Sequence, residues 1–126
     1  MASIKTNKGR EKMAKAHAGT AALPPIAYVA VGSGGVDSNL APRTLTGAEN
    51  VLFHEVIRKA PVQTFPTTYT SRYTIRVDAQ ADSLIGTNVN EAALIDSQGD
   101  VVALKTFTNK GLELGTVIDF DYDAEF

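Results

Sequence analysis

The sequence contains no cysteine and no tryptophan, and it has only two histidines among its 126 residues. Without cysteine, neither a disulfide framework nor a thiolate metal site can form. We interpret His17 as a capping residue at the end of a helix, where a cation suits the helix dipole, and His54 as a structural residue of a strand. His54 and Glu55 are neighbours on that predicted strand, so their side chains point to opposite faces and cannot share an acid–base site. We therefore expect no enzyme, no catalytic residues, no cofactor, no metal and no small-molecule substrate.

Long hydrophobic runs and a strong net charge are also missing. No apolar stretch approaches the ~20 residues that a membrane-spanning helix needs, and the N-terminus has no apolar segment that resembles a secretion signal. The formal net charge is −2, which provides no broad attraction to nucleic acid or to an anionic membrane. We expect a protein made in the cytoplasm that has neither a membrane nor a nucleic acid as its partner.

The clearest pattern that is present is a β-hairpin from Asn90 to Phe107. Its turn is Ser97-Gln98-Gly99-Asp100, and apolar residues flank the turn on both sides. Ala92 and Leu94 are expected to face one side of the sheet while Ala93 and Ile95 face the other. Arms that are apolar on both faces belong in a sheet with both faces covered, so we expect the hairpin to be architectural.

The remaining segments predict one domain over residues 1–126, with a helix in residues 1–19 and mainly antiparallel β-structure in residues 24–126. We expect a helix over Ile4–Ala18 with Thr6 or Asn7 as N-cap, strands over Ile26–Val31, Val51–Val62, Tyr69–Gln80 and Thr116–Phe126, and one helical turn over Thr44–Asn50. Pro61 and Pro66 are expected to break the chain between two of these strands. The predicted fold class is α+β: an N-terminal helix packed on an antiparallel β-sheet or sandwich of about six strands.

Three groups of polar or glycine residues are candidates for contacts. The first is Gly32-Ser33-Gly34-Gly35, which lacks the Lys-Ser/Thr of a phosphate loop and leads into a loop through Arg43 that is long enough to lie on a neighbouring subunit. The second is the basic cluster of the first helix, which either touches nucleic acid or an acidic neighbour, or forms a solvated face. The third is the row Asp119, Asp121, Asp123 and Glu125, which is too regular for a calcium loop. This row either prevents self-pairing of an edge strand or docks a basic partner such as the lysine-rich helix of an adjacent subunit.

Three motifs give the chain a resemblance to a known family. Thr6 and Gly9 match an "lT..G" start, Val31-Gly32-Ser33-Gly34 matches "vGdG", and the hairpin VNEAALIDSQGDVVALKTF matches "i.E.gLyD.dGdLvA" through Glu91, Leu94, Asp96, Gly99, Asp100, Val102 and Ala103. In this order the chain resembles the N-terminal domain of tail-fibre (tail-collar) proteins of tailed bacteriophages, over most of its length. Ser33 departs from the pattern because the family has an acidic residue there.

The resemblance implies a structural virion protein of a bacteriophage tail or tail-like particle. Family members usually carry a fibre shaft and a receptor-binding tip after this domain, whereas this sequence has neither, which implies attachment to the tail or baseplate rather than host recognition. The implied partners are other tail or baseplate proteins and further copies of the chain in a homo-oligomer. The expected interface residues are Lys8, Arg10, Lys12, Lys15, Gly32, Gly34, Gly35, Asp119, Asp121 and Asp123.

Two other functions stay open at this point. The chain could be a head-decoration or head–tail joining protein from a different part of the same particle, which an image of the virion would distinguish by the location of its density. A small ligand-binding domain or enzyme would need turnover that depends on residues such as His54 or Asp121.

Overall fold

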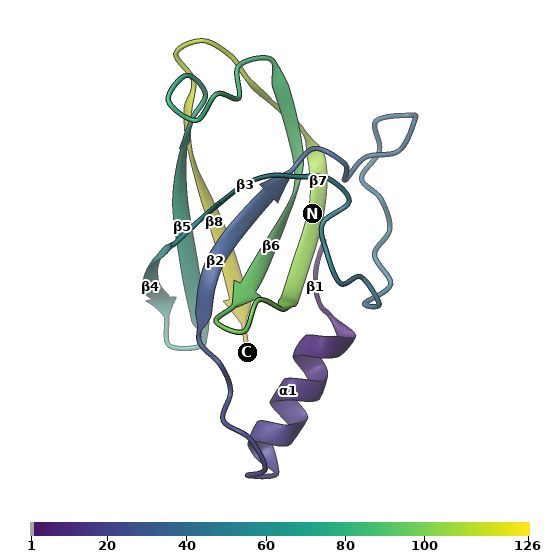
Figure 1. Cartoon of the computed structure of the whole chain (residues 1–126), viewed down its shortest axis with the longest axis vertical. Helices are drawn as coiled ribbons and strands as arrows, with labels where there is room; N and C mark the ends of the chain where they lie inside the picture. The colour runs from purple at the N-terminus through teal and green to yellow at the C-terminus, as the bar shows by residue number, and fades with distance from the viewer. Residues whose placement is uncertain (1) are drawn as a thin grey trace.

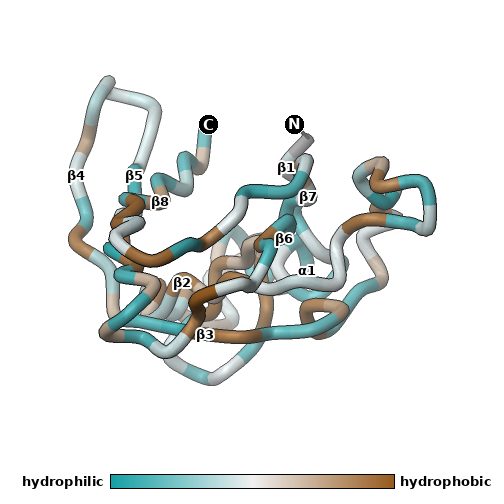
Figure 2. Tube along the Cα trace, turned by 90° about the horizontal axis from the view of Figure 1, so that it is seen from above, coloured by the Kyte–Doolittle hydropathy of each residue, from teal (hydrophilic) through white to brown (hydrophobic). Residues whose placement is uncertain are grey.

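The computed structural model describes residues 2–126, which form two layers of antiparallel strands and one helix (Figure 1). The elements are β1 (Ala2–Lys5), α1 (Asn7–His17), β2 (Ile26–Gly32), β3 (Glu55–Lys59), β4 (Val62–Thr67), β5 (Thr70–Asp78), β6 (Thr87–Asp96), β7 (Val101–Leu112) and β8 (Val117–Glu125). A five-stranded sheet has the order β1-β7-β6-β2-β3, and a three-stranded sheet has the order β4-β5-β8. The view from above in Figure 2 shows β4 and β5 as a layer beside β2 and β3. The β-rich α+β class is confirmed, but the expected strand number of about six is too low for residues 2–126.

The hairpin of β6 and β7 lies at the centre of the five-stranded sheet, as predicted. Ala93 pairs with Leu104, and Gly99 in the turn has a φ of +86°, a conformation that glycine adopts at little cost. Ala92 and Leu94 face the interior between the two sheets, whereas Ala93 and Ile95 face the opposite side of the five-stranded sheet. Both faces are buried, so the hairpin is covered from two sides.

The core between the sheets comes from alternating positions on β2, β5 and β8. Val29, Ile75, Val77 and Phe120 are all less than a tenth exposed and pack together with Tyr122. Each such side chain contributes roughly 1.5–3 kcal/mol when it is removed from water. The strands expected over Tyr69–Gln80 and Thr116–Phe126 are therefore confirmed as β5 and β8.

The outer face of the five-stranded sheet is covered by the β2–β3 segment, residues 33–54. Leu52 is buried and Leu45 half-buried against Ala93 and Ile95 of β6. The segment also lies over β7, because the Thr106 hydroxyl donates to the Arg43 carbonyl at 2.8 Å. This long connection has no regular secondary structure, and it covers the face of the central hairpin that points away from the three-stranded sheet.

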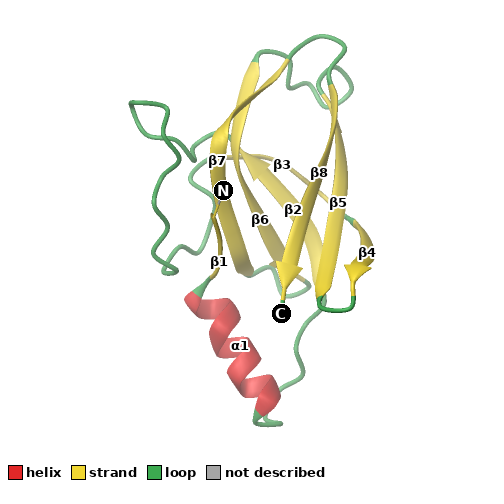
Figure 3. Cartoon of the chain, turned by 180° about the vertical axis from the view of Figure 1, so that it is seen from behind, coloured by secondary structure: helices red, strands yellow, loops and turns green. Residues whose placement is uncertain are grey.

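The helix begins later than predicted, because Ile4 and Lys5 belong to β1. Ile4 pairs with Leu104 of β7, and Thr6 is the N-cap of α1. Within the helix only Gly9 is buried, so α1 packs closely on the sheet by its first turn and extends beyond one end of the molecule (Figures 1 and 3). We expected the whole helix to pack on the sheet, but only its first turn does so.

Two further expectations are wrong in the middle of the chain. Residues 44–50 form no helical turn; instead Glu49 accepts hydrogen bonds from the N–H groups of Thr46 and Gly47. The strand expected over residues 51–62 starts only at Glu55, and a second strand, β4, follows Pro61. Pro66 is accommodated in β4 because this strand lies at a sheet edge, where the pairing with β5 shifts between Thr64 and Thr67.

Candidate functional site

The glycine-rich turn after β2 is attached to the central hairpin by two buried polar side chains, Glu91 and Asn90. The Glu91 carboxylate accepts hydrogen bonds from the N–H groups of Gly34 at 2.8 Å, Phe53 at 2.7 Å and His54 at 2.8 Å. Asn90 accepts from the Gly35 N–H at 2.6 Å. Glu91 is fully buried and Asn90 is 2 % exposed, so both ends of the β2–β3 segment are fixed by side chains of β6.

The glycines at positions 32, 34 and 35 allow this close approach. A Cβ on Gly32 would lie 2.4 Å from the His54 carbonyl oxygen, and a Cβ on Gly35 would lie 2.4 Å from the Asn90 carbonyl oxygen. A Cβ on Gly34 would lie 2.7 Å from the Phe53 Cβ. The structure therefore gives these predicted interface glycines a packing function inside the chain.

Ser33 and His54 lie side by side at this turn, with the Ser33 Oγ 2.6 Å from the His54 Nδ1. A hydroxyl beside an imidazole is a component of nucleophilic catalysis. Such catalysis also needs free N–H donors, which stabilise the negatively charged oxygen of the reaction intermediate. The nearby N–H groups of Gly34 and Gly35 are bonded to Glu91 and Asn90. Over residues 2–126, no group of three or more His, Asp or Glu side chains could hold a metal ion. The geometry at this turn therefore serves attachment of the loop better than catalysis or anion binding.

The start of the helix is fixed to the hairpin by Thr6 and Gly9. The Thr6 hydroxyl donates to the Val101 carbonyl at 2.7 Å and accepts from the Gly9 N–H at 2.9 Å. A Cβ on Gly9 would lie 2.3 Å from the Val102 carbonyl oxygen, so only glycine fits between the helix and β7. These residues orient α1 relative to the hairpin.

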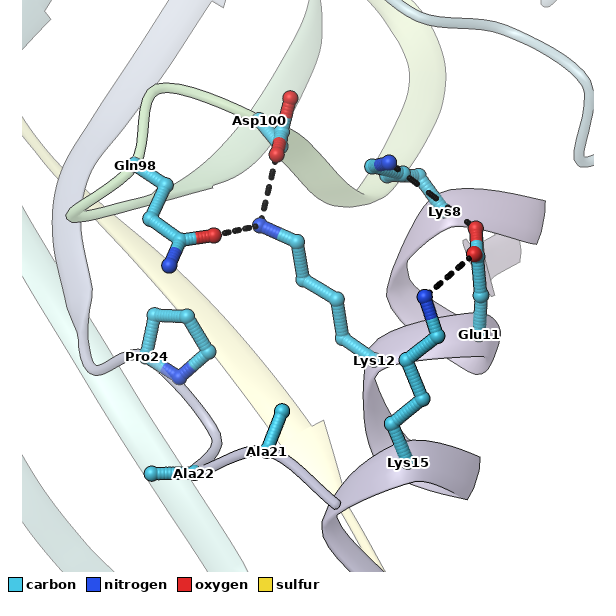
Figure 4. A pocket seen from close by; sticks show the side chains of 9 residues that line it. All are labelled: Lys8, Glu11, Lys12, Lys15, Ala21, Ala22, Pro24, Gln98 and Asp100. Atoms are coloured by element: carbon cyan, nitrogen blue, oxygen red, sulfur yellow. Dashed lines mark hydrogen bonds and ion pairs between the residues drawn. The ribbon is translucent and has the colours of Figure 1, made fainter.

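Lys12 connects the middle of the helix to the hairpin turn (Figure 4). Its Nζ donates to the carboxylates of Asp96 at 2.5 Å and Asp100 at 2.6 Å and to the Gln98 Oε1 at 3.0 Å. Burial by itself would lower the pKa of Lys12, but the hydrogen bonds to Asp100 and Asp96 outweigh it and raise this pKa. The same contact lowers the pKa of Asp100. Lys12 was expected at an interface between proteins, and the structure places its ammonium against the hairpin of its own chain.

The other basic residues predicted for the interface are exposed. Lys8 and Lys15 flank Glu11, with distances of 3.9 Å and 2.9 Å to its carboxylate, and Arg10 is exposed on the same helix. Exposed pairs of this kind contribute little to stability, because water and salt screen the charges. These three side chains are accessible to a partner.

The acidic row on β8 is paired with β5. Asp119 and Arg76 form a two-pronged ion pair at 2.8 and 3.2 Å, and Asp123 and Arg72 form another at 2.8 and 3.0 Å. Between them Asp121 accepts from the Thr74 hydroxyl at 2.6 Å. Hydrogen bonds to the arginines lower the pKa values of Asp119 and Asp123. The row is thus half-neutralised by the neighbouring strand, which the spacing of the acidic residues alone did not indicate.

Sequence reasoning did not predict the function of three residues at these surfaces. Glu91 was recognised as part of the hairpin motif and Asn90 precedes it, but their anchoring of the β2–β3 segment was not predicted. Lys105 lies on the inward face of β7 beside Ala103 and Phe107, and its Nζ donates to the Asp121 carbonyl at 3.1 Å. Burial lowers the pKa of Lys105.

Comparison with known proteins adds no relative to this description. No protein-family model, no curated protein and no solved structure matches the chain. Across residues 2–126, no helix is both long and apolar enough to cross a membrane.

Proposed function

We propose that this chain is an attachment subunit of a bacteriophage tail or of a phage-tail-like particle, which joins neighbouring tail or baseplate proteins through its surface. The observation that carries the proposal is the convergence of the three motifs behind the resemblance to the N-terminal domain of tail-fibre proteins. Thr6 and Gly9 contact Val101 and Val102, and Gly34 bonds to Glu91. Residues that resemble the family at three distant places in the sequence thus meet around one hairpin.

The hairpin holds two elements in fixed positions at the surface. One is α1, whose exposed face carries Lys8, Arg10 and Lys15. The other is the β2–β3 segment, which is anchored at both ends and exposes Leu40, Val51 and Phe53 by 62 %, 70 % and 46 %. Large apolar side chains that are exposed on an ordered segment are typical of protein–protein contacts.

Phe53 and Arg43 form the most specific part of this surface. The Arg43 guanidinium lies 5.1 Å from the centre of the Phe53 ring, and the Arg43 Nε donates to the Gly34 carbonyl at 2.8 Å. The Phe53 N–H is bonded to Glu91, so both side chains project from a fixed backbone. Aromatic and arginine side chains held in this way are the residues that contribute most of the binding energy in interfaces.

Electron microscopy of particles assembled in cells that produce a tagged chain tests the proposal. We expect the tag at the tail or baseplate and not on the capsid, and we expect light scattering of the purified chain to show a homo-oligomer. Phe53→Ala should reduce incorporation into tails, whereas Phe65→Ala, which removes an exposed phenylalanine from β4, should not. A tag found only on the capsid would support the head-decoration or head–tail joining function, and absence from particles would refute a virion function.

A further inference from the structure

Strand β8 has one paired and one unpaired side. Nine consecutive residue pairs, from Thr70↔Glu125 to Asp78↔Val117, join it to β5 without a shift in register. No strand of residues 2–126 pairs with its other side. A long and regular sheet edge of this kind can pair with an extended segment of another chain.

The main-chain groups of alternate residues on β8 point to this open edge. Even-numbered residues face β5, because the Phe126 N–H donates to the Tyr69 carbonyl and the Thr116 carbonyl accepts from the Ala79 N–H, both at 2.9 Å. Since direction alternates along an antiparallel strand, the N–H and C=O groups of Asp119, Asp121 and Asp123 face the open edge. The Lys105 Nζ, which reaches the Asp121 carbonyl from β7, agrees with this direction.

A groove of about 330 Å³ runs beside the open edge, between β8 and β1. Residues 3–5 of β1 and residues 122–125 of β8 form its walls, and Ala103 also lines it. One hydrogen bond of 2.7 Å between the Ser3 Oγ and the Tyr122 OH crosses from one wall to the other. The groove offers space for side chains of an added strand along residues 122–125, and a second hollow of about 160 Å³ beside Lys105 and Phe107 offers space along residues 118–122.

The charges at the open edge determine which charges an added strand must carry. A second copy of β8 would place Asp119, Asp121 and Asp123 beside like charges, which is unfavourable. Strand β5 shows the favourable chemistry on the paired side, with Arg72 and Arg76 opposite two of these carboxylates. Asp121 has a threonine opposite it, and its side chain is 46 % exposed.

We propose that the open edge of β8 binds an extended segment of another protein as a fourth strand, with lysine or arginine at alternate positions beside Asp119, Asp121 and Asp123. The side chains between these cations enter the groove beside β1. Lys105 fills the acceptor site on the Asp121 carbonyl until a peptide N–H replaces it, and its partly buried ammonium then returns to water. This interaction is separate from the Arg43–Phe53 surface and does not depend on a function in tails.

A peptide that copies residues 70–78 of β5, TSRYTIRVD, with blocked ends, is the probe. Nuclear magnetic resonance should show that the peptide slows hydrogen exchange of the Asp119, Asp121 and Asp123 amides, whereas the Phe120 and Tyr122 amides, already bonded to β5, should not change. A peptide with glutamate in place of both arginines should not bind. Binding that protects no odd-numbered amide of β8, or that exposes the amides of β4 and β5 by strand exchange, would overturn the proposal.

Charge-reversal variants of the full chain test the electrostatic part. Asp121→Lys should weaken peptide binding by about fivefold or more. The peptide has a threonine opposite Asp121 and arginines at the two diagonal positions, so the attraction of this side chain to both arginines becomes a repulsion. Glu113→Lys makes the same change in net charge on the exposed β7–β8 connection, and its affinity should equal that of the original chain. Equal affinity of both variants would contradict the proposed alignment. If the peptide fails to bind while the tagged chain is found in tails, this inference alone is refuted.

Discussion

Glu91 and Gly34 are 57 residues apart in the sequence, yet the Gly34 N–H donates a hydrogen bond of 2.8 Å to the Glu91 Oε2. The same oxygen accepts from the His54 N–H, and the other carboxylate oxygen accepts from the Phe53 N–H. A buried carboxylate is costly unless hydrogen bonds compensate for the lost water, and main-chain donors from both ends of the β2–β3 segment supply them. The position of this segment therefore depends on one side chain of the central hairpin.

Replacing Glu91 by glutamine should destabilise the chain by about 2–3 kcal/mol. One carboxylate oxygen becomes an NH₂ group, which faces N–H donors and leaves them without an acceptor. Urea unfolding followed by circular dichroism measures the loss, and limited proteolysis should show earlier cleavage within residues 33–54. Glu113→Gln, at an exposed position, should stay within about 0.5 kcal/mol of the original chain. Equal unfolding midpoints for the two variants would contradict the anchoring function of Glu91.

Replacing Gly9 by alanine should also destabilise the chain, although alanine favours helices by about 1 kcal/mol over glycine. The new Cβ would lie 2.3 Å from the Val102 carbonyl oxygen, so α1 must move away from β7. Overpacking of this kind costs about 1–3 kcal/mol, and we expect a net loss of about 1–2 kcal/mol in urea unfolding. Lys8→Ala, on the exposed side of the same turn, is the control and should show no loss. A stabilised Gly9→Ala chain would mean that the helix start is not in tight contact with the sheet.

The hairpin and the strands β5 and β8 could be predicted because a strand buries every second residue, and this period is visible in the sequence. Strand β1 could not, because its four residues acquire extended structure by pairing with β7, about a hundred residues away. Strand β4 is exposed along its whole length and contains Pro66, so it has neither the pattern nor the composition of a strand. Local patterns describe one segment at a time, and these strands depend on distant partners.

The same limit applies to the candidate contact residues, because local patterns do not indicate distant partners. The basic helix and the acidic strand were recognisable as charged segments, but their partners were not. Lys12 faces Asp96 and Asp100, 84 and 88 residues away, and Asp123 faces Arg72 at a separation of 51 residues. Which charges remain free for another protein therefore follows only from the fold.

Replacing Lys12 by methionine should cost about 1–2 kcal/mol, more than the same replacement at Lys15. Methionine keeps the length and apolar bulk of the side chain but leaves the Asp96 carboxylate, whose side chain is 1 % exposed, without its cation. Asp96 retains hydrogen bonds from the N–H groups of Gln98 and Asp100, which limits the loss. At Lys15 the pair with Glu11 is exposed and screened by water, so its loss should change the stability little. Hydrogen exchange of the helix amides should increase in Lys12→Met alone; equal effects of the two variants would show that the Lys12 contact does not anchor the helix.

Acid should weaken the same anchor, and Lys12→Met should make the chain less sensitive to acid. The Lys12 hydrogen bond holds the pKa of Asp100 below its ordinary value in the folded chain, so the unfolded chain takes up this proton at a higher pH. The stability that the contact provides is therefore complete above the unfolded pKa of about 3.9 and is lost as the pH falls through the lower folded pKa. The raised pKa of Lys12 has the opposite effect on the pH dependence. The stability that it contributes is complete below the unfolded pKa of about 10.4 and is lost as the pH rises through the pKa of the folded chain. Urea midpoints measured at neutral pH and in steps down to about pH 2 should fall less steeply in Lys12→Met than in the original chain, and parallel curves would show that Asp100 is not coupled to Lys12.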